Sequence, residues 1–244
     1  MRLPPYLTPA IVLILIWVCM PGRMLSQNTY GSEVWVGYIS SIRISEKYSI
    51  WNDFHYVPTA FWANRHGLTR DFGRFGRFTG GYAYVVTATG FSEVLNRREH
   101  RPWWQHELTS TFREHWGWRA RLRYDRRIRE AVSASDFTGE WLAYNRWRVM
   151  LGLSYTFRYL PEGRSWQLHL LNELLLNNGK QFEGNTLDQN RTYIMLGYQK
   201  PGLRIQFGPH VRAIPTAVGY NYRFGAALWI IQSIDGRAWL GWPW

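Results

Sequence analysis

The sequence predicts an all-β protein that folds as a single antiparallel, up-and-down transmembrane β-barrel of ten or twelve strands with an arginine-rich lumen. Three observations support this prediction. Polar and apolar residues alternate along most of the chain, which is the period of strands with two unlike faces. Aromatic residues make up 17% of the sequence and include 15 tryptophans, which suits aromatic girdles at two membrane interfaces. Short and longer connections also alternate, as in outer-membrane barrels.

Residues 1–26 have the composition of a secretory signal peptide, and the barrel domain is expected over residues 27–244. Arg2 precedes an apolar run, residues 10–20, that is too short to span a bilayer comfortably. A proline and a glycine end this run. An uncleaved anchor helix is the alternative interpretation. Cleavage of the signal would produce an exported chain, so we expect the protein in the outer membrane, with membrane lipid as its partner.

The charge and the cysteine count narrow the possible functions. The formal net charge is +12, and nucleic-acid binding is one use of a basic chain. Here the arginines alternate with apolar residues along strands, so we expect no nucleic-acid partner. The single cysteine, Cys19, lies in the signal segment. The mature barrel therefore has no disulfide and no cysteine metal site, and we expect no metal and no cofactor.

The first predicted strands cover residues 33–43, 48–56, 61–72 and 77–87. The third shows the pattern clearly, because Arg65, Thr69 and Asp71 share one face. A glycine-rich turn from Gly73 to Gly76 separates it from the fourth. A polar loop then leads to a long segment, residues 99–116, and a tight turn is expected near Gly117.

The most regular charge alternation lies in residues 118–130, W-R-A-R-L-R-Y-D-R-R-I-R-E. One face is charged at every second position, at Arg119, Arg121, Arg123, Asp125, Arg127 and Arg129. The opposite face carries Trp118, Leu122 and Tyr124. A soluble sheet would place this apolar face on a core, whereas a membrane barrel would place it in lipid. Arg126 is the one charge on the apolar face, so we expect it near a membrane interface, where it can snorkel, or at a bulge.

The remaining predicted strands cover residues 140–157, 165–177, 188–199, 203–212 and 220–231. Tight turns near Gly163 and Gly202 alternate with longer loops, which is typical of a barrel with short periplasmic turns. About eleven segments emerge in total. A closed single-chain barrel of this class has an even number of strands, so we expect ten or twelve. Residues 237–244 could supply part of the additional strand.

The inward faces of these strands are expected to form a network of charged and polar side chains in the lumen. Its predicted members are Glu99, Arg101, Glu107, Arg113, Arg119, Arg121, Arg123, Asp125, Arg127, Arg146, Arg148, His169, Glu173, Arg191, Arg204 and Arg223. We expect cross-strand ion pairs to fill and stiffen a largely plugged barrel. A water-filled basic constriction that attracts small anionic or polar solutes is the alternative.

A lipid-modifying enzyme, of the deacylase or phospholipase type, is a second functional class. His106 and Ser110 share one face, and His169 and Glu173 share another. Four residues of strand separate the members of each pair by roughly 13 Å, which prevents a direct hydrogen bond and a catalytic dyad. No motif of a serine hydrolase, a zinc protease or a phosphate loop is present. No catalytic residue is assigned, although a cross-strand pairing of His169 with a serine or threonine stays open.

Several short motifs occur in order along the chain: E-H-R-P-W-W-Q at residues 99–105, the arginine-rich strand after it, Asn172-Glu173, and D-Q-N-R at residues 188–191. With these motifs the chain resembles the domain of unknown function 2490 family, which comprises predicted outer-membrane β-barrel proteins of unassigned function. The resemblance covers residues 33–231. It implies export and a barrel but no reaction. The predicted role is therefore structural or in small-solute transport, with the lipid-modifying enzyme as the alternative.

Overall fold

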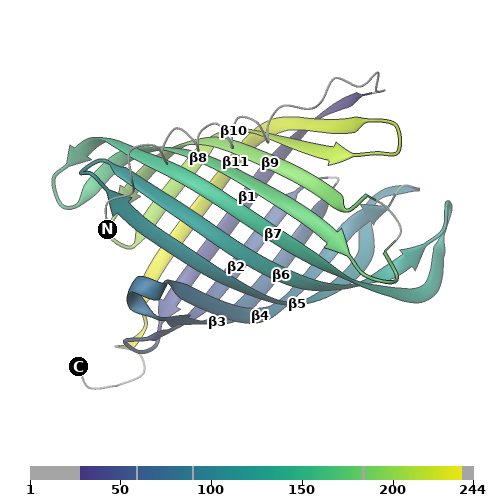
Figure 1. The fold of residues 1–244 in the computed structure, drawn as a ribbon, viewed down its shortest axis with the longest axis horizontal. Helices are drawn as coiled ribbons and strands as arrows, with labels where there is room; N and C mark the ends of the chain where they lie inside the picture. The colour runs from purple at the N-terminus through teal and green to yellow at the C-terminus, as the bar shows by residue number, and fades with distance from the viewer. Residues whose placement is uncertain (1–27, 59, 90, 183–184, 238–244) are drawn as a thin grey trace.

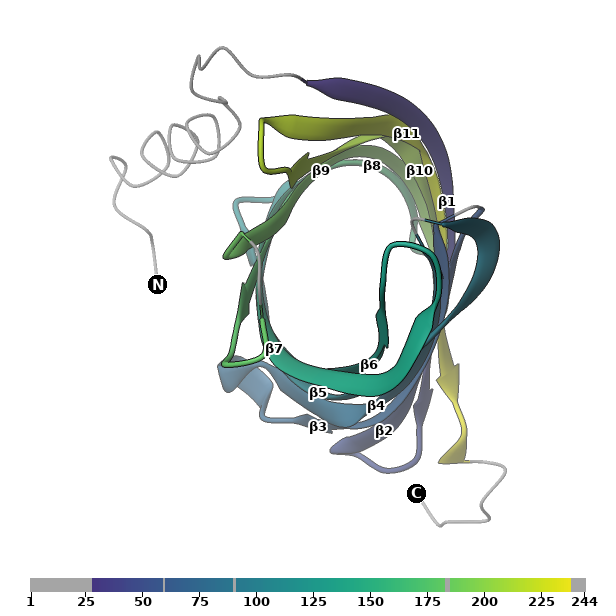
Figure 2. The ribbon, with the colours of Figure 1, turned by 90° about the vertical axis from the view of Figure 1, so that its right-hand side faces the viewer.

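The computed structural model describes residues 28–58, 60–89, 91–182 and 185–237, which form one closed barrel of eleven strands (Figures 1 and 2). The strands are β1 (Thr29–Arg43), β2 (Tyr48–Val57), β3 (Phe61–Asp71), β4 (Arg77–Thr89), β5 (Ser92–Phe112), β6 (Trp116–Val132), β7 (Phe137–Leu160), β8 (Arg164–Asn178), β9 (Leu187–Lys200), β10 (Leu203–Pro215) and β11 (Tyr220–Asp235). A single 3₁₀ turn, η1 (Gly73–Phe75), joins β3 to β4. The predicted all-β barrel is thus confirmed. Among the described residues, no helix is long and apolar enough to cross a membrane.

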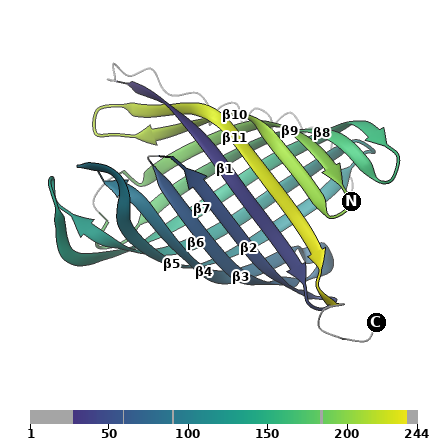
Figure 3. The same cartoon turned by 180° about the vertical axis from the view of Figure 1, so that it is seen from behind.

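The barrel closes through a parallel pair of strands. Each strand pairs antiparallel with its neighbour in sequence, but β1 and β11 run side by side in the same direction over all 15 residues of β1 (Figure 3). An even number is required only when the closing pair is antiparallel. The barrel therefore closes with eleven strands, whereas ten or twelve were expected. Its sheet contains one parallel pair of strands beside the antiparallel pairs. The proposed extra strand at residues 237–244 lies outside the described residues except for Arg237, which follows β11.

The connections define two unlike ends of the barrel. The end that carries residues 44–47, 72–76, 113–115, 161–163 and 201–202 is called the turn end, and the opposite end the loop end. The predicted tight turns all lie at the turn end. At the loop end, much of the predicted loop sequence is strand, because β5 and β7 extend to 21 and 24 residues. The loop end thus carries long hairpins that extend beyond the barrel, whereas the turn end carries short turns (Figure 1).

The turn between β5 and β6 lies earlier than predicted. Arg113 adopts a left-handed φ of 58° and, with its two successors, forms the turn, while Gly117 lies inside β6. Arg113 is consequently an exposed turn residue, and its predicted place in the lumen is wrong. Polar and apolar residues alternate through Arg113 without a break, so the strand period does not reveal the turn.

Alternation sorts the side chains between an outer surface and a filled interior. Large apolar side chains are exposed on the outside, such as Leu122, Val149 and Leu168. The interior holds charged residues and also an apolar cluster, which comprises Trp35, Val57, Leu171, Tyr193, Met195 and Ala227. The predicted arginine-rich lumen is confirmed, and it also contains an apolar cluster that the sequence did not indicate.

Gly225 is required where the first and last strands meet. A Cβ added at Gly225 would lie 1.7 Å from the Glu33 carbonyl oxygen, whereas one added at Gly80 would meet only Phe78 Cε1, at 3.9 Å. Gly225→Ala should therefore lower stability by about 1–3 kcal/mol, as overpacking does, and Gly80→Ala should change it little. Urea unfolding in detergent, followed by tryptophan fluorescence, measures both. Equal midpoints would contradict a tight β1–β11 contact.

Candidate functional site in the barrel lumen

The charged groups of the lumen form an ion-pair network whose first centre is Glu99 on β5. Arg101 Nε donates to Glu99 Oε1 at 2.5 Å, and Arg127 Nη2 donates to Oε2 at 2.7 Å. Arg129 approaches at 4.0 Å. Glu99 is 0% exposed, so its charge is tolerated only because these arginines surround it.

A second centre is Asp125 on β6. Arg123 donates to Asp125 Oδ1, with its Nη2 at 2.7 Å, and Arg148 lies 3.8 Å from Oδ2. The Arg123 guanidinium also stacks over the Trp103 ring at 4.2 Å, a cation–π contact. Asp125 is 0% exposed and Arg123 is 1% exposed. The charges of this second centre are therefore shielded from solvent.

Glu173 on β8 is the third centre, and three strands bring arginines to it. Its oxygens lie 2.6 Å from Arg121, 2.8 Å from Arg148 and 3.5 Å from Arg191. Because Arg148 contacts both Glu173 and Asp125, the second and third centres form one continuous network. One carboxylate shared by three guanidinium groups leaves this part of the lumen with excess positive charge.

Two further groups were not predicted as parts of the site. At the loop end, Glu33 on β1 accepts hydrogen bonds from His210 at 2.8 Å and Arg212 at 2.5 Å, both on β10. This contact reaches across β11 at the position where Gly225 has no side chain, since an added Cβ there would lie 3.1 Å from His210 Cε1. Only the parallel closure brings β1 next to β11, so the alternation along single strands could not have indicated the contact of Glu33 with His210 and Arg212.

The second unpredicted group joins β1, β2 and β3. Trp35 Nε1 donates to His55 Nδ1 at 2.6 Å, which places the ring proton on Nε2, 3.0 Å from Asp53 Oδ1. Arg65 donates to the same Asp53 oxygen at 2.7 Å. Both ring nitrogens of His55 are thus occupied, so the histidine is a structural link and has no nitrogen left to act as a base.

Other predicted members lie in the lumen but outside the three centres. Arg146 pairs with Asp188 at 2.8 Å, and Glu107 pairs with Arg77 at 2.6 Å and Arg119 at 3.6 Å. Arg204 donates to Gln199 at 3.1 Å. Arg223 packs beside Gly31 and forms no ion pair within the described chain.

The histidines do not form a nucleophile–base pair in the described part of the chain. His169 is buried beside Ser154, its register partner on β7, but its Nε2 has no hydrogen-bond partner there. His106 lies on the outer surface and bonds to the Phe75 carbonyl oxygen at 2.7 Å. His66, also on the outer surface, bonds to the Asn52 side chain at 2.8 Å. His106 and His66 bond to other groups and His169 Nε2 has no partner among the described residues, so the lipid-modifying alternative has no visible dyad.

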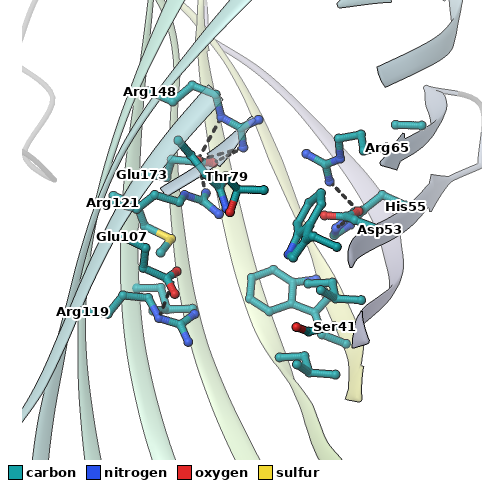
Figure 4. A pocket seen from close by; sticks show the side chains of 18 of the residues that line it. Ser41, Asp53, His55, Arg65, Thr79, Glu107, Arg119, Arg121, Arg148 and Glu173 are labelled. Atoms are coloured by element: carbon teal, nitrogen blue, oxygen red, sulfur yellow. Dashed lines mark hydrogen bonds and ion pairs between the residues drawn. The ribbon is translucent and has the colours of Figure 1, made fainter. Parts of the chain in front are cut away.

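A cavity of about 200 Å³ lies beside the network (Figure 4). One wall carries Arg119, Arg121 and Glu173, while Asp53 and Arg65 stand on the opposite wall. This volume exceeds the roughly 10–15 Å³ that one water requires. The described residues include no group of three or more histidines, cysteines and carboxylates placed to hold a metal.

These features define a closed β-barrel with an arginine-rich lumen. Residues 32–223 match the model of the family described as "Protein of unknown function (DUF2490)", and the chain belongs to this family. No curated protein and no solved structure gives a significant match. The family membership confirms the resemblance of the sequence motifs and supplies no activity.

Removal of Glu173 should destabilise the barrel because three arginines would lose their shared partner. We expect Glu173→Gln to lower the free energy of unfolding by about 3–5 kcal/mol, the usual cost of breaking a buried ion pair. The control is Glu162→Gln, since Glu162 is exposed in a turn and lies 3.8 Å from Arg164. Urea midpoints in detergent measure both variants. A loss no greater for Glu173→Gln than for the control would show that the network carries little stability.

Proposed function

We propose that the protein is an outer-membrane β-barrel whose lumen is plugged by its own side chains. The outer surface supports a membrane location. Leu122, Val149, Leu151, Leu168 and Leu170 are exposed on the adjacent strands β6, β7 and β8. A continuous apolar surface of this kind is costly in water and is stable in lipid.

Aromatic residues bound this apolar surface at two levels. Trp116 and Tyr155 are in contact near the turn end, with ring centroids 4.9 Å apart. Tyr124 and Trp147 are in contact eight residues further along β6, with centroids 5.0 Å apart. Eight residues span about 27 Å of strand, or about 20 Å along the barrel axis at a tilt of about 40°. This height is close to the apolar band of about 25 Å in known membrane barrels.

Arg126 supports the same placement. It lies just beyond Tyr124 on the outer face of β6, and its Nη1 donates to Asn145 Oδ1 at 2.9 Å. The Tyr124 hydroxyl donates to the same oxygen at 2.8 Å. The predicted alternative, a bulge at Arg126, is not observed, because the irregularity in β6 lies between Glu130 and Val132. The proposed membrane thus ends at the tyrosine and leaves Arg126 at the interface.

One observation supports a plugged lumen: charged side chains within it are inaccessible to water. Glu99, Asp125 and Arg123 lie on the neighbouring strands β5 and β6, with exposures of 0%, 0% and 1%. An open pore would leave such side chains hydrated. The proposed role is therefore structural, or in the handling of small anions without a continuous channel.

The membrane location predicts heat-modifiable migration. The protein should fractionate with outer membranes, and an unboiled sample should migrate differently from a boiled one, because a closed hydrogen-bonded sheet resists detergent at low temperature. Cell fractionation and gel electrophoresis measure this. Recovery as a water-soluble protein would contradict the proposal.

The plug predicts an absence of conductance. The wild-type barrel should give no current steps in planar bilayers, whereas a double variant, Arg123→Ala with Asp125→Ala, should give small steps. The double change removes both members of one ion pair, so it opens space without leaving either charge of that pair alone. A bilayer treated with detergent only is the control. Reproducible steps from the wild type would show an open channel.

A further inference from the structure

The cavity beside the ion-pair network extends toward one end of the barrel. Its lining includes Ser41 and Ser233, each two residues from the turn-end terminus of its strand. It also includes Arg77, the first residue of β4. Toward the loop end, Glu99 and Asp125 are buried. The cavity thus extends to the turn end of the lumen.

The cavity wall carries more positive than negative charge. Its lining contains eight arginines and three carboxylates, Asp53, Glu107 and Glu173. Two of the arginines have their carboxylate partners outside the wall, because Arg101 pairs with Glu99 and Arg146 with Asp188. Six arginines therefore share three carboxylates, an excess of three positive charges. In a partly dehydrated space such an excess attracts anions.

Several polar atoms of the lining side chains are buried without a partner among the described residues. Three are donors, namely Arg65 Nε, Arg121 Nε and Trp229 Nε1. They come from β3, β6 and β11, on different sides of the cavity. An unmatched buried donor costs about 1–3 kcal/mol. A ligand with several acceptor oxygens would neutralise the excess charge of the cavity wall.

We propose that this cavity binds a small oxyanion of the phosphate or phosphate-monoester class, admitted from the turn end. The proposal rests on the plugged-barrel function, since an open channel would hydrate the site. A tetrahedral oxyanion fits because it presents acceptors in several directions, whereas the donors lie on three strands. Free phosphate and the phosphate-monoester headgroup of phosphatidic acid share this chemistry.

The test is calorimetric titration of the folded barrel, in nonionic detergent and phosphate-free buffer at fixed ionic strength, with inorganic phosphate. We expect saturable binding, weakened about tenfold by Arg121→Gln, the loss expected for a charge-assisted hydrogen bond. Arg164→Gln makes the same charge change at the first residue of β8, outside the cavity lining, and should leave affinity unchanged. Absence of binding, or equal weakening by both variants, overturns the proposal.

Two further variants keep the test decisive if Arg121→Gln fails to fold. Trp229→Phe removes the unpartnered indole N–H while keeping an aromatic ring, and should weaken binding about threefold. Glu107→Gln removes a competing negative charge and should strengthen binding. If these residues were only structural, both substitutions would change phosphate affinity in the same direction. A change of affinity in the same direction for both variants therefore overturns the site.

A second titration, with short-chain phosphatidic acid below its micelle concentration, identifies the source of the oxyanion. Tighter binding of the lipid than of phosphate, lost in Trp229→Phe, supports a headgroup site, and preference for phosphate supports a free anion. Binding of neither overturns the proposal. Heat-modifiable migration is checked on the same samples. A membrane-derived barrel that binds nothing therefore overturns the oxyanion site alone, while a protein outside the membrane overturns the proposed function.

Discussion

The rest of the structure depends on the pairing of buried charges inside a closed barrel. An isolated charge there would be prohibitively costly, so each carboxylate is placed where several arginines converge. Glu99, Asp125 and Glu173 take their partners from neighbouring strands and from their own strands. A slip of one residue would move every such side chain to the opposite face. The ion-pair network therefore stabilises the lumen and fixes the register of β5 to β9 at the same time.

The parallel closing pair is the second constraint. It permits an odd number of strands and places the start of β1 and the end of β11 at opposite ends of the barrel (Figure 3). Parallel pairing is slightly weaker per residue than antiparallel pairing, and β1 is additionally tied to β10 through Glu33. Gly225 allows this contact because a larger residue would collide with the β1 backbone.

The pairing of charges differs between parts of the interior. Around Glu99 and Asp125, carboxylates and arginines are matched and buried. Around the cavity, six arginines share three carboxylates, and three donors stay unmatched among the described residues. Complete pairing would have given a more stable plug. The excess of arginines over carboxylates around the cavity is therefore explained by the proposed binding role and not by a purely structural role.

The sequence by itself determined the barrel class and most of the inward charges, because strand alternation assigns each side chain to a face without knowledge of its neighbours. Arg119, Arg121 and Arg123 illustrate this, since all three point inward as the alternation predicts. It could not place Arg113, because a left-handed turn residue interrupts no alternation. Only the tertiary structure decided the partners of each charge, the parallel closure through Gly225, and the cavity between Arg65 and Arg121. These depend on which strands meet around the barrel, and alternation along one strand carries no information about that.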